Sequence, residues 1–75
     1  MSARQNDRLV KMANQIALNM AAWGEEEVVV ARTGEHIAKF WTSAMRRQLL
    51  DHYHASGEGL APVVARLLAE LHGAD

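Results

Sequence analysis

Apolar side chains recur every three or four residues in the first third of the chain, which is the spacing of one helix face. The stripe comprises Leu9, Met12, Ala13, Ile16, Met20 and Trp23, and the opposite face carries Lys11, Asn14, Gln15 and Asn19. Leu18 interrupts this polar face. Asn6 or Asp7 suits the N-cap, and Gly24 suits the position after a helix end. The pattern therefore predicts a first helix that ends just before Gly24.

A second helix is predicted to begin at the three glutamates of residues 25–27, which favour the positive end of a helix dipole. The three valines that follow are β-branched, but a single short strand would have no second strand to pair with. Gly34 weakens a helix interior by about 1 kcal/mol relative to alanine. Thr33 is able to cap a new start, so we expect a kink or a break near residues 33–34.

Two further helices complete the pattern. Thr42 suits the N-cap of a third helix, whose inner stripe is Met45, Leu49 and Tyr53. Residues 56–59 hold two glycines and predict a loop, after which Pro62 suits the first turn of a fourth helix. The apolar side of that helix comprises Leu60, Val64, Leu67, Leu68 and Leu71. The prediction is an all-α domain of four short helices over residues 1–75, with residues 1–5 and 73–75 frayed.

The composition points to a protein that needs a partner. The chain has 75 residues, 49% of them hydrophobic, and it contains no cysteine, which excludes disulfides and thiolate metal sites. A single core in a domain of this size rarely supplies more than about 3–5 kcal/mol. The remaining common source of stability is another protein surface, so we expect a subunit of a larger assembly.

Net charge and hydropathy exclude other classes of partner. The net charge of −1 argues against the basic patch that nucleic-acid binding requires. No stretch approaches the roughly 20 apolar residues of a membrane span, and no apolar run of signal-peptide length begins the chain. We therefore expect a cytoplasmic protein without nucleic-acid or membrane contacts.

The titratable residues predict no active site and no metal site. His52 and His54 are two residues apart, roughly 200° around a helix, and His36 and His72 belong to other predicted helices. None of the motifs that place a nucleophile, a phosphate or a zinc ion is present. We expect no catalytic, cofactor-binding or metal-binding residue in this chain.

Arg46 and Arg47 leave two interpretations open. They are either solvated charges early in the third helix or cations that meet an external acceptor, because cations are unfavourable near a helix N-terminus. Arginine, methionine and aromatic residues are enriched at protein interfaces. Phe40, Trp41 and Met45 accordingly form either the core alone or the core together with a partner contact.

Three segments between Asn6 and Leu71 are distinctive: NDRLVKMANQIALNM, HIAKFWTSAMRRQLL and GEGLAPVVARLLAEL. They resemble the delta subunit of cytoplasmic NAD-dependent formate dehydrogenases that contain molybdenum or tungsten. The most specific positions are His36, Phe40, Trp41, Met45 and Arg46. Ser43 stands where the family usually has proline, which loosens the turn between the second and third helices, and Ala61 replaces a capping residue before Pro62.

The resemblance implies a non-catalytic accessory subunit that sits on the large alpha subunit and supports cofactor insertion, assembly or stability. The parent complex would hold a bis-pterin-guanine-dinucleotide molybdenum or tungsten centre, iron–sulfur clusters, FMN and NAD, none of them in this chain. In this view Phe40 and Trp41 close the core. The residues expected to bind the partner are His36, Trp41, Met45, Arg46, Arg47 and Leu18.

Two other functions remain to be compared with this one. A self-associating structural protein would bury the same apolar excess in a homodimer. A helix-turn-helix module would open its recognition helix at residues 42–47, but the net charge and the flanking Glu35 and Asp51 disfavour it.

Overall fold

The computed structural model describes the backbone of residues 2–74 and the side chains of residues 6–71. Within this range the chain forms four α-helices and one short 3-10 helix, and it contains no strand. The elements are α1 (Ser2–Met20), η1 (Ala21–Trp23), α2 (Glu26–Phe40), α3 (Ser43–Ala55) and α4 (Pro62–Ala74). The predicted all-α fold of four helices is confirmed.

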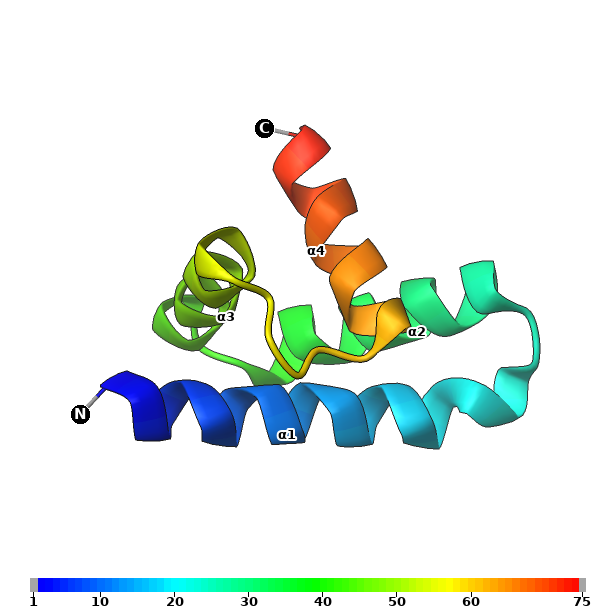
Figure 1. The fold of residues 1–75 in the computed structure, drawn as a ribbon. Helices are drawn as coiled ribbons and strands as arrows, with labels where there is room; N and C mark the ends of the chain where they lie inside the picture. The colour runs from blue at the N-terminus through cyan, green and yellow to red at the C-terminus, as the bar shows by residue number, and fades with distance from the viewer. Residues whose placement is uncertain (1, 75) are drawn as a thin grey trace.

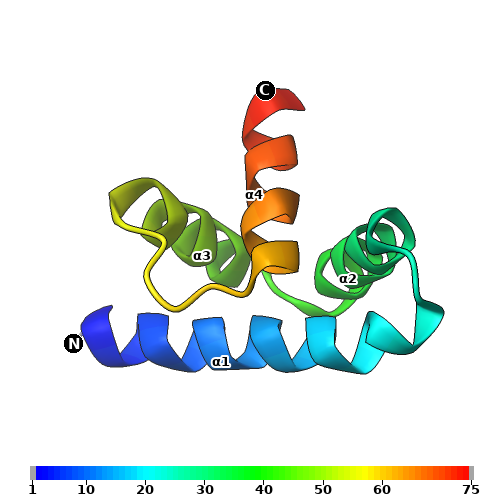
Figure 2. The same cartoon turned by 45° about the vertical axis from the view of Figure 1, so that its right-hand side comes forward.

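The arrangement places α4 between α2 and α3. After the turn at Gly24, α2 runs back beside α1 in the opposite direction (Figure 1). The first turn of α4 lies against α1, and the rest of α4 points away from it, with α2 on one side and α3 on the other (Figure 2). The core therefore lies where all four helices meet, near the middle of α1.

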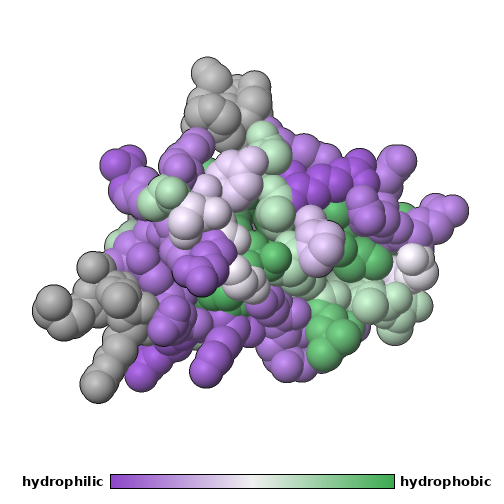
Figure 3. Space-filling model, viewed as in Figure 1, coloured by the Kyte–Doolittle hydropathy of each residue, from purple (hydrophilic) through white to green (hydrophobic). Residues whose placement is uncertain are grey.

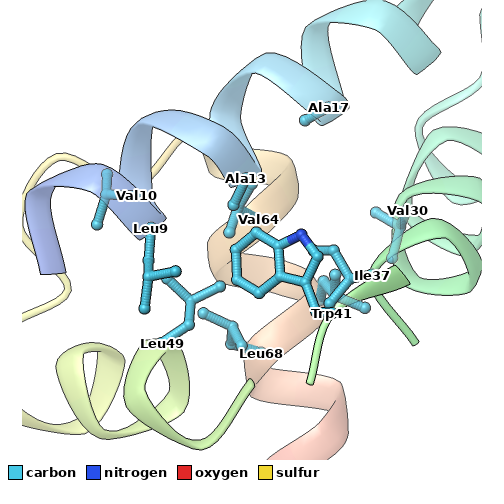
Figure 4. Close-up of a cluster of buried hydrophobic side chains, with 11 residues drawn as sticks. Leu9, Val10, Ala13, Ala17, Val30, Ile37, Trp41, Leu49, Val64 and Leu68 are labelled. Atoms are coloured by element: carbon cyan, nitrogen blue, oxygen red, sulfur yellow. The ribbon is translucent and has the colours of Figure 1, made fainter. Parts of the chain in front are cut away.

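The core is built from small residues of α1 and larger side chains of the other helices. Ala13 and Ala17 of α1 are buried, which lets the neighbouring helices approach closely. The indole of Trp41 lies at the centre of the cluster, close to Val64 and Ile37 (Figure 4). The buried cluster comprises Leu9, Val10, Ala13, Ala17, Val30, Ile37, Trp41, Leu49, Val64, Leu67 and Leu68.

The first helix begins earlier than its polar residues predicted. α1 starts at Ser2, so neither Asn6 nor Asp7 is the N-cap. α1 continues into η1, which ends at Trp23, so the helical segment ends just before Gly24 as predicted, and the φ of 92° at Gly24 suits glycine. Residues 2–5 and 73–74 are helical, and their fraying stays a prediction; residues 1 and 75 lie outside the described residues.

The second helix is continuous, so the predicted alternative of a break near residues 33–34 is wrong, and a kink there stays a prediction. Gly34 serves packing instead, because a Cβ there would lie 2.9 Å from Leu67 Cδ1 on α4. The glycine thus makes room for the Leu67 side chain. Thr33 is not a cap but a fully buried residue, and its hydroxyl has no hydrogen-bond partner within the described residues.

The third and fourth helices begin where their local signals predicted. The Thr42 hydroxyl accepts a hydrogen bond of 3.1 Å from the Met45 amide, which confirms the N-cap of α3. Pro62 is the first residue of α4, and Leu49 and Val64 are buried on the predicted inner faces.

The loop between α3 and α4 is held by a side chain of α1. The Asn14 Oδ1 accepts a hydrogen bond from the Ala61 amide, and its Nδ2 donates one to the Gly59 carbonyl, both at 2.9 Å. Asn14 had been assigned to the polar face of the first helix, and its role in positioning α4 was not predicted.

Candidate docking surface

The two adjacent aromatic residues at the end of α2 lie in opposite environments. The Trp41 side chain is 6% exposed and belongs to the core, whereas Phe40 is 68% exposed. The expectation that Phe40 closes the core is therefore wrong. The core position of Trp41 is confirmed. Because Trp41 is buried, little of its surface is accessible to a partner.

The end of α2 explains this difference. Trp41 has left the helix and is extended, with φ −94° and ψ 146°, although its amide still donates to the Ile37 carbonyl. Because Trp41 is no longer helical, its side chain does not follow the spacing of roughly 100° per residue that relates helical neighbours. The extended conformation directs the indole inward and leaves Phe40 outside.

Phe40 stacks on a second candidate residue, His36. Their ring centroids are 4.7 Å apart and their planes are tilted by 43°. The two residues are four apart on α2, so their side chains lie on one face of the helix. His36 is half-buried, and the pair presents an aromatic surface at the end of α2.

Arg46 has an acceptor inside the chain. Its Nη1 donates to the carbonyl oxygens of Ala38, at 3.1 Å, and Trp41, at 3.0 Å. These carbonyls belong to the C-terminal end of α2, where a cation meets the negative end of the helix dipole. Arg46 thus joins α2 to α3 across their corner, a role that the sequence interpretation as a partner contact missed.

The remaining candidates do not share one surface. Arg47 is exposed and forms no ion pair within the described residues. Met45 is half-buried and packs on the core from α3, and Leu18 is 68% exposed on α1. The exposure of Leu18 agrees with its position on the polar face of the first helix.

A groove lies between the C-terminal half of α2, α3 and α4. Its volume is about 740 Å³, and we call it the leucine groove. Its apolar lining comprises Ile37, Ala38, Leu49, Leu50, Leu67, Leu68 and Leu71. Its polar lining comprises Ser43, Arg46, Arg47, Asp51 and His54. Arg46 and Arg47 are the two candidates from the sequence that this groove brings together.

A second hollow lies on the other side, between α2 and α4, and we call it the acidic groove. It has a volume of about 290 Å³, and its charged lining comprises Glu27, Glu35, Glu70 and Arg66. The Arg66 guanidinium donates to Glu26 at 2.7 Å and to Glu70 at 3.0 Å, and these hydrogen bonds raise its pKa. The two grooves flanking α4 thus carry charges of opposite sign.

Large apolar side chains are also exposed outside the grooves. Figure 3 shows apolar patches, in green, over the parts of α1 and α2 nearest η1, with polar side chains around them. The exposed large apolar residues outside the grooves are Met12, Leu18, Trp23 and Phe40, and Leu71 of the leucine groove is exposed as well. Trp23 is partly covered by the Arg32 guanidinium, which lies 4.2 Å from the centre of its ring.

The histidines and carboxylates of residues 6–71 do not converge on one site. Among the described residues, no three histidine, aspartate or glutamate side chains come close enough to hold a metal ion. His52 Nε2 lies 2.8 Å from the Glu58 carbonyl, so this nitrogen is the donor, and the Tyr53 and His54 rings are 5.5 Å apart. No helix in the described part of the chain has the length and apolar character of a membrane span.

The fold and these surfaces define a small helical protein with an apolar groove and several exposed apolar side chains. Residues 8–67 match the family model of the NADH-dependent formate dehydrogenase delta subunit FdsD. Because this match covers most of the 75 residues, the chain belongs to that family. No curated protein and no solved structure is significantly similar to it.

Proposed function

We propose that the chain is a non-catalytic accessory subunit that binds the large molybdopterin-containing subunit of a cytoplasmic NAD-dependent formate dehydrogenase. In this role it supports the assembly, stability or cofactor insertion of the large subunit. Membership of the delta-subunit family carries the proposal. The leucine groove and the exposed Phe40, Leu18 and Leu71 support it, since a partner would cover this apolar surface.

The cofactors of the complex are proposed to reside in other subunits. These are the bis-pterin-guanine-dinucleotide molybdenum or tungsten centre, the iron–sulfur clusters and FMN, and NAD is the electron acceptor. Iron–sulfur clusters are held mainly by cysteine thiolates, and this chain has no cysteine. The absence of cysteine supports a purely protein–protein role for the chain.

The proposal is tested by producing the formate dehydrogenase with and without this chain. We expect the tagged chain to co-purify with the large subunit, and the large subunit made without it to contain less metal and pterin or to unfold at a lower temperature. Equal cofactor content, equal stability and no co-purification would contradict the proposed function.

Self-association is the alternative function, and the same apolar surfaces would then be covered by a second copy. Sedimentation velocity of the isolated chain at micromolar concentration separates the two. A stable homodimer that does not exchange with the large subunit would favour the structural protein over the accessory subunit.

A further inference from the structure

The leucine groove differs from a small-molecule site in where its polar groups lie. Small-molecule pockets combine an apolar lining with a few precisely oriented polar groups inside. Here the aliphatic lining residues such as Leu68 and Leu50 are buried or half-buried, while Arg47 and Asp51 are exposed. The buried hydroxyl of Thr33 does not line the groove. This arrangement suits an apolar protein segment better than a polar ligand.

The all-helical walls of the groove indicate the conformation of that segment. An extended peptide gains its affinity by pairing with the edge of a sheet, and the described part of the chain has no strand. A groove between helices instead receives an amphipathic helix, whose side chains three and four residues apart form one apolar face. Leu71 is 49% exposed and Leu50 is half-buried, so both have surface for such a face to cover.

The charges beside the groove indicate the polar side of the segment. Arg46 uses one end of its guanidinium on the carbonyls of α2, whereas the exposed Arg47 has no carboxylate partner within the described residues. Asp51 is the one carboxylate in the lining. On the opposite side of α4, the carboxylates Glu26 and Glu70 already occupy Arg66. The leucine groove is thus the side of α4 on which a cation is available to a partner.

We propose that the leucine groove binds an amphipathic, acidic helix of the large subunit, with apolar side chains against Leu50 and Leu71 and a carboxylate paired with Arg47. The inference rests on the proposed function and specifies the chemistry of its partner. Arginine pairs with a carboxylate through two parallel hydrogen bonds, so Arg47 would fix the orientation of the helix along the groove.

Matched variants of the full chain test this proposal against the purified large subunit. Arg47→Glu reverses the charge beside the groove, and Lys11→Glu makes the same change on α1, which contributes no residue to the lining. Leu71→Asp places a charge in the groove, and Ala69→Asp places one at an exposed position of the same helix outside it. We expect Arg47→Glu and Leu71→Asp to raise Kd at least tenfold and both controls to change it less than twofold.

A photo-crosslinking side chain at Ser43, which lines the groove and is exposed, identifies the segment by mass spectrometry. The expected crosslink lies in a helical segment with apolar residues at spacings of three and four and at least one aspartate or glutamate. Changing that carboxylate to arginine should restore binding to Arg47→Glu.

The outcomes separate the inference from the function on which it rests. If the unchanged chain does not bind the large subunit, the proposed function fails. If it binds and the groove variants bind equally well, the function stands and the groove assignment is wrong. A crosslink to a second copy of this chain, or a dimer that Leu71→Asp dissociates, would also overturn the groove assignment.

Discussion

On the inner side of the corner between α2 and α3 lie Trp41 and Arg46, and on its outer side lie their sequence neighbours Phe40 and Arg47. The inner tryptophan fills the core, and the inner arginine binds the last carbonyls of α2. The outer phenylalanine and arginine have no comparable contacts that hold the fold. In each pair of adjacent residues of the same chemical type, one therefore stabilises the domain, and the other is exposed and accessible to a partner.

The largest expected difference in stability is between alanine variants of the two aromatic residues. Trp41→Ala removes a buried indole and should cost about 3–5 kcal/mol, which is comparable to the whole stability of a domain this size. Phe40→Ala should change the free energy of unfolding by less than about 1 kcal/mol, because its ring is mostly exposed. Urea unfolding followed by circular dichroism measures both variants. If the Phe40→Ala chain is unfolded, Phe40 contributes to the core and its assignment to the outer side of the corner is wrong.

Alanine substitution of the two arginines should also cost more stability at the inner position, Arg46, than at the outer one, Arg47, but the difference should be smaller. Arg46→Ala leaves the Ala38 and Trp41 carbonyls without this donor, and we expect a loss of about 1 kcal/mol because the site is only part-buried. Arg47→Ala should stay within about 0.5 kcal/mol of the unchanged chain. Equal unfolding midpoints for the two variants in guanidinium chloride would show that the hydrogen bonds of Arg46 to α2 do not stabilise the fold.

Local signals in the sequence predicted where α3 and α4 begin, since Thr42 and Pro62 act within one helical turn. The sequence could not predict which aromatic is buried, because that depends on the residue at which α2 ends. It could not assign Arg46 either, since its acceptors are backbone carbonyls that have no signature in the sequence. Gly34 predicts a weakened helix, whereas in the structure it makes room for the side chain of Leu67, 33 residues away along the chain.

The candidate surface was predicted only in part for the same reason. Leu67, Leu68 and Leu71 were placed correctly on one side of the fourth helix, but a helical pattern does not show that the neighbouring helices leave a groove beside them. The interaction of Asn14 with the loop before α4 also joins residues more than 40 positions apart. Spacing within one helix predicts which face is apolar, and the contacts between helices decide what covers that face.

Thr33 is an inward-facing polar residue of α2 that, unlike Arg46, has no hydrogen-bond partner in the described chain. Its hydroxyl is fully buried without a hydrogen-bond partner in the described chain. Thr33→Val has nearly the same shape and removes this unpaired group, so it should stabilise the protein by about 1 kcal/mol. Thermal unfolding checks the direction. A loss of stability would show that the hydroxyl bonds to the carbonyl one turn earlier in the helix.

Leu18 is exposed on α1, and its substitution should have the smallest effect on stability. Leucine and lysine have similar helix propensities and the side chain is mostly exposed, so Leu18→Lys should change the unfolding free energy by less than about 0.5 kcal/mol. A large loss of helical content would instead place Leu18 in the core. The neighbouring Asn19→Lys adds the same charge without removing an apolar side chain and serves as its control.

The same variant tests how far the partner reaches around the domain. Leu18 was predicted to contact the partner, yet the leucine groove contains no residue of α1. If the large subunit covers both surfaces, Leu18→Lys weakens binding while Asn19→Lys does not. Its effect should then add to that of Arg47→Glu within about 0.3–0.5 kcal/mol, as expected for sites without shared contacts. Normal binding of Leu18→Lys beside a defective Arg47→Glu would confine the interface to the side of the molecule formed by α2, α3 and α4.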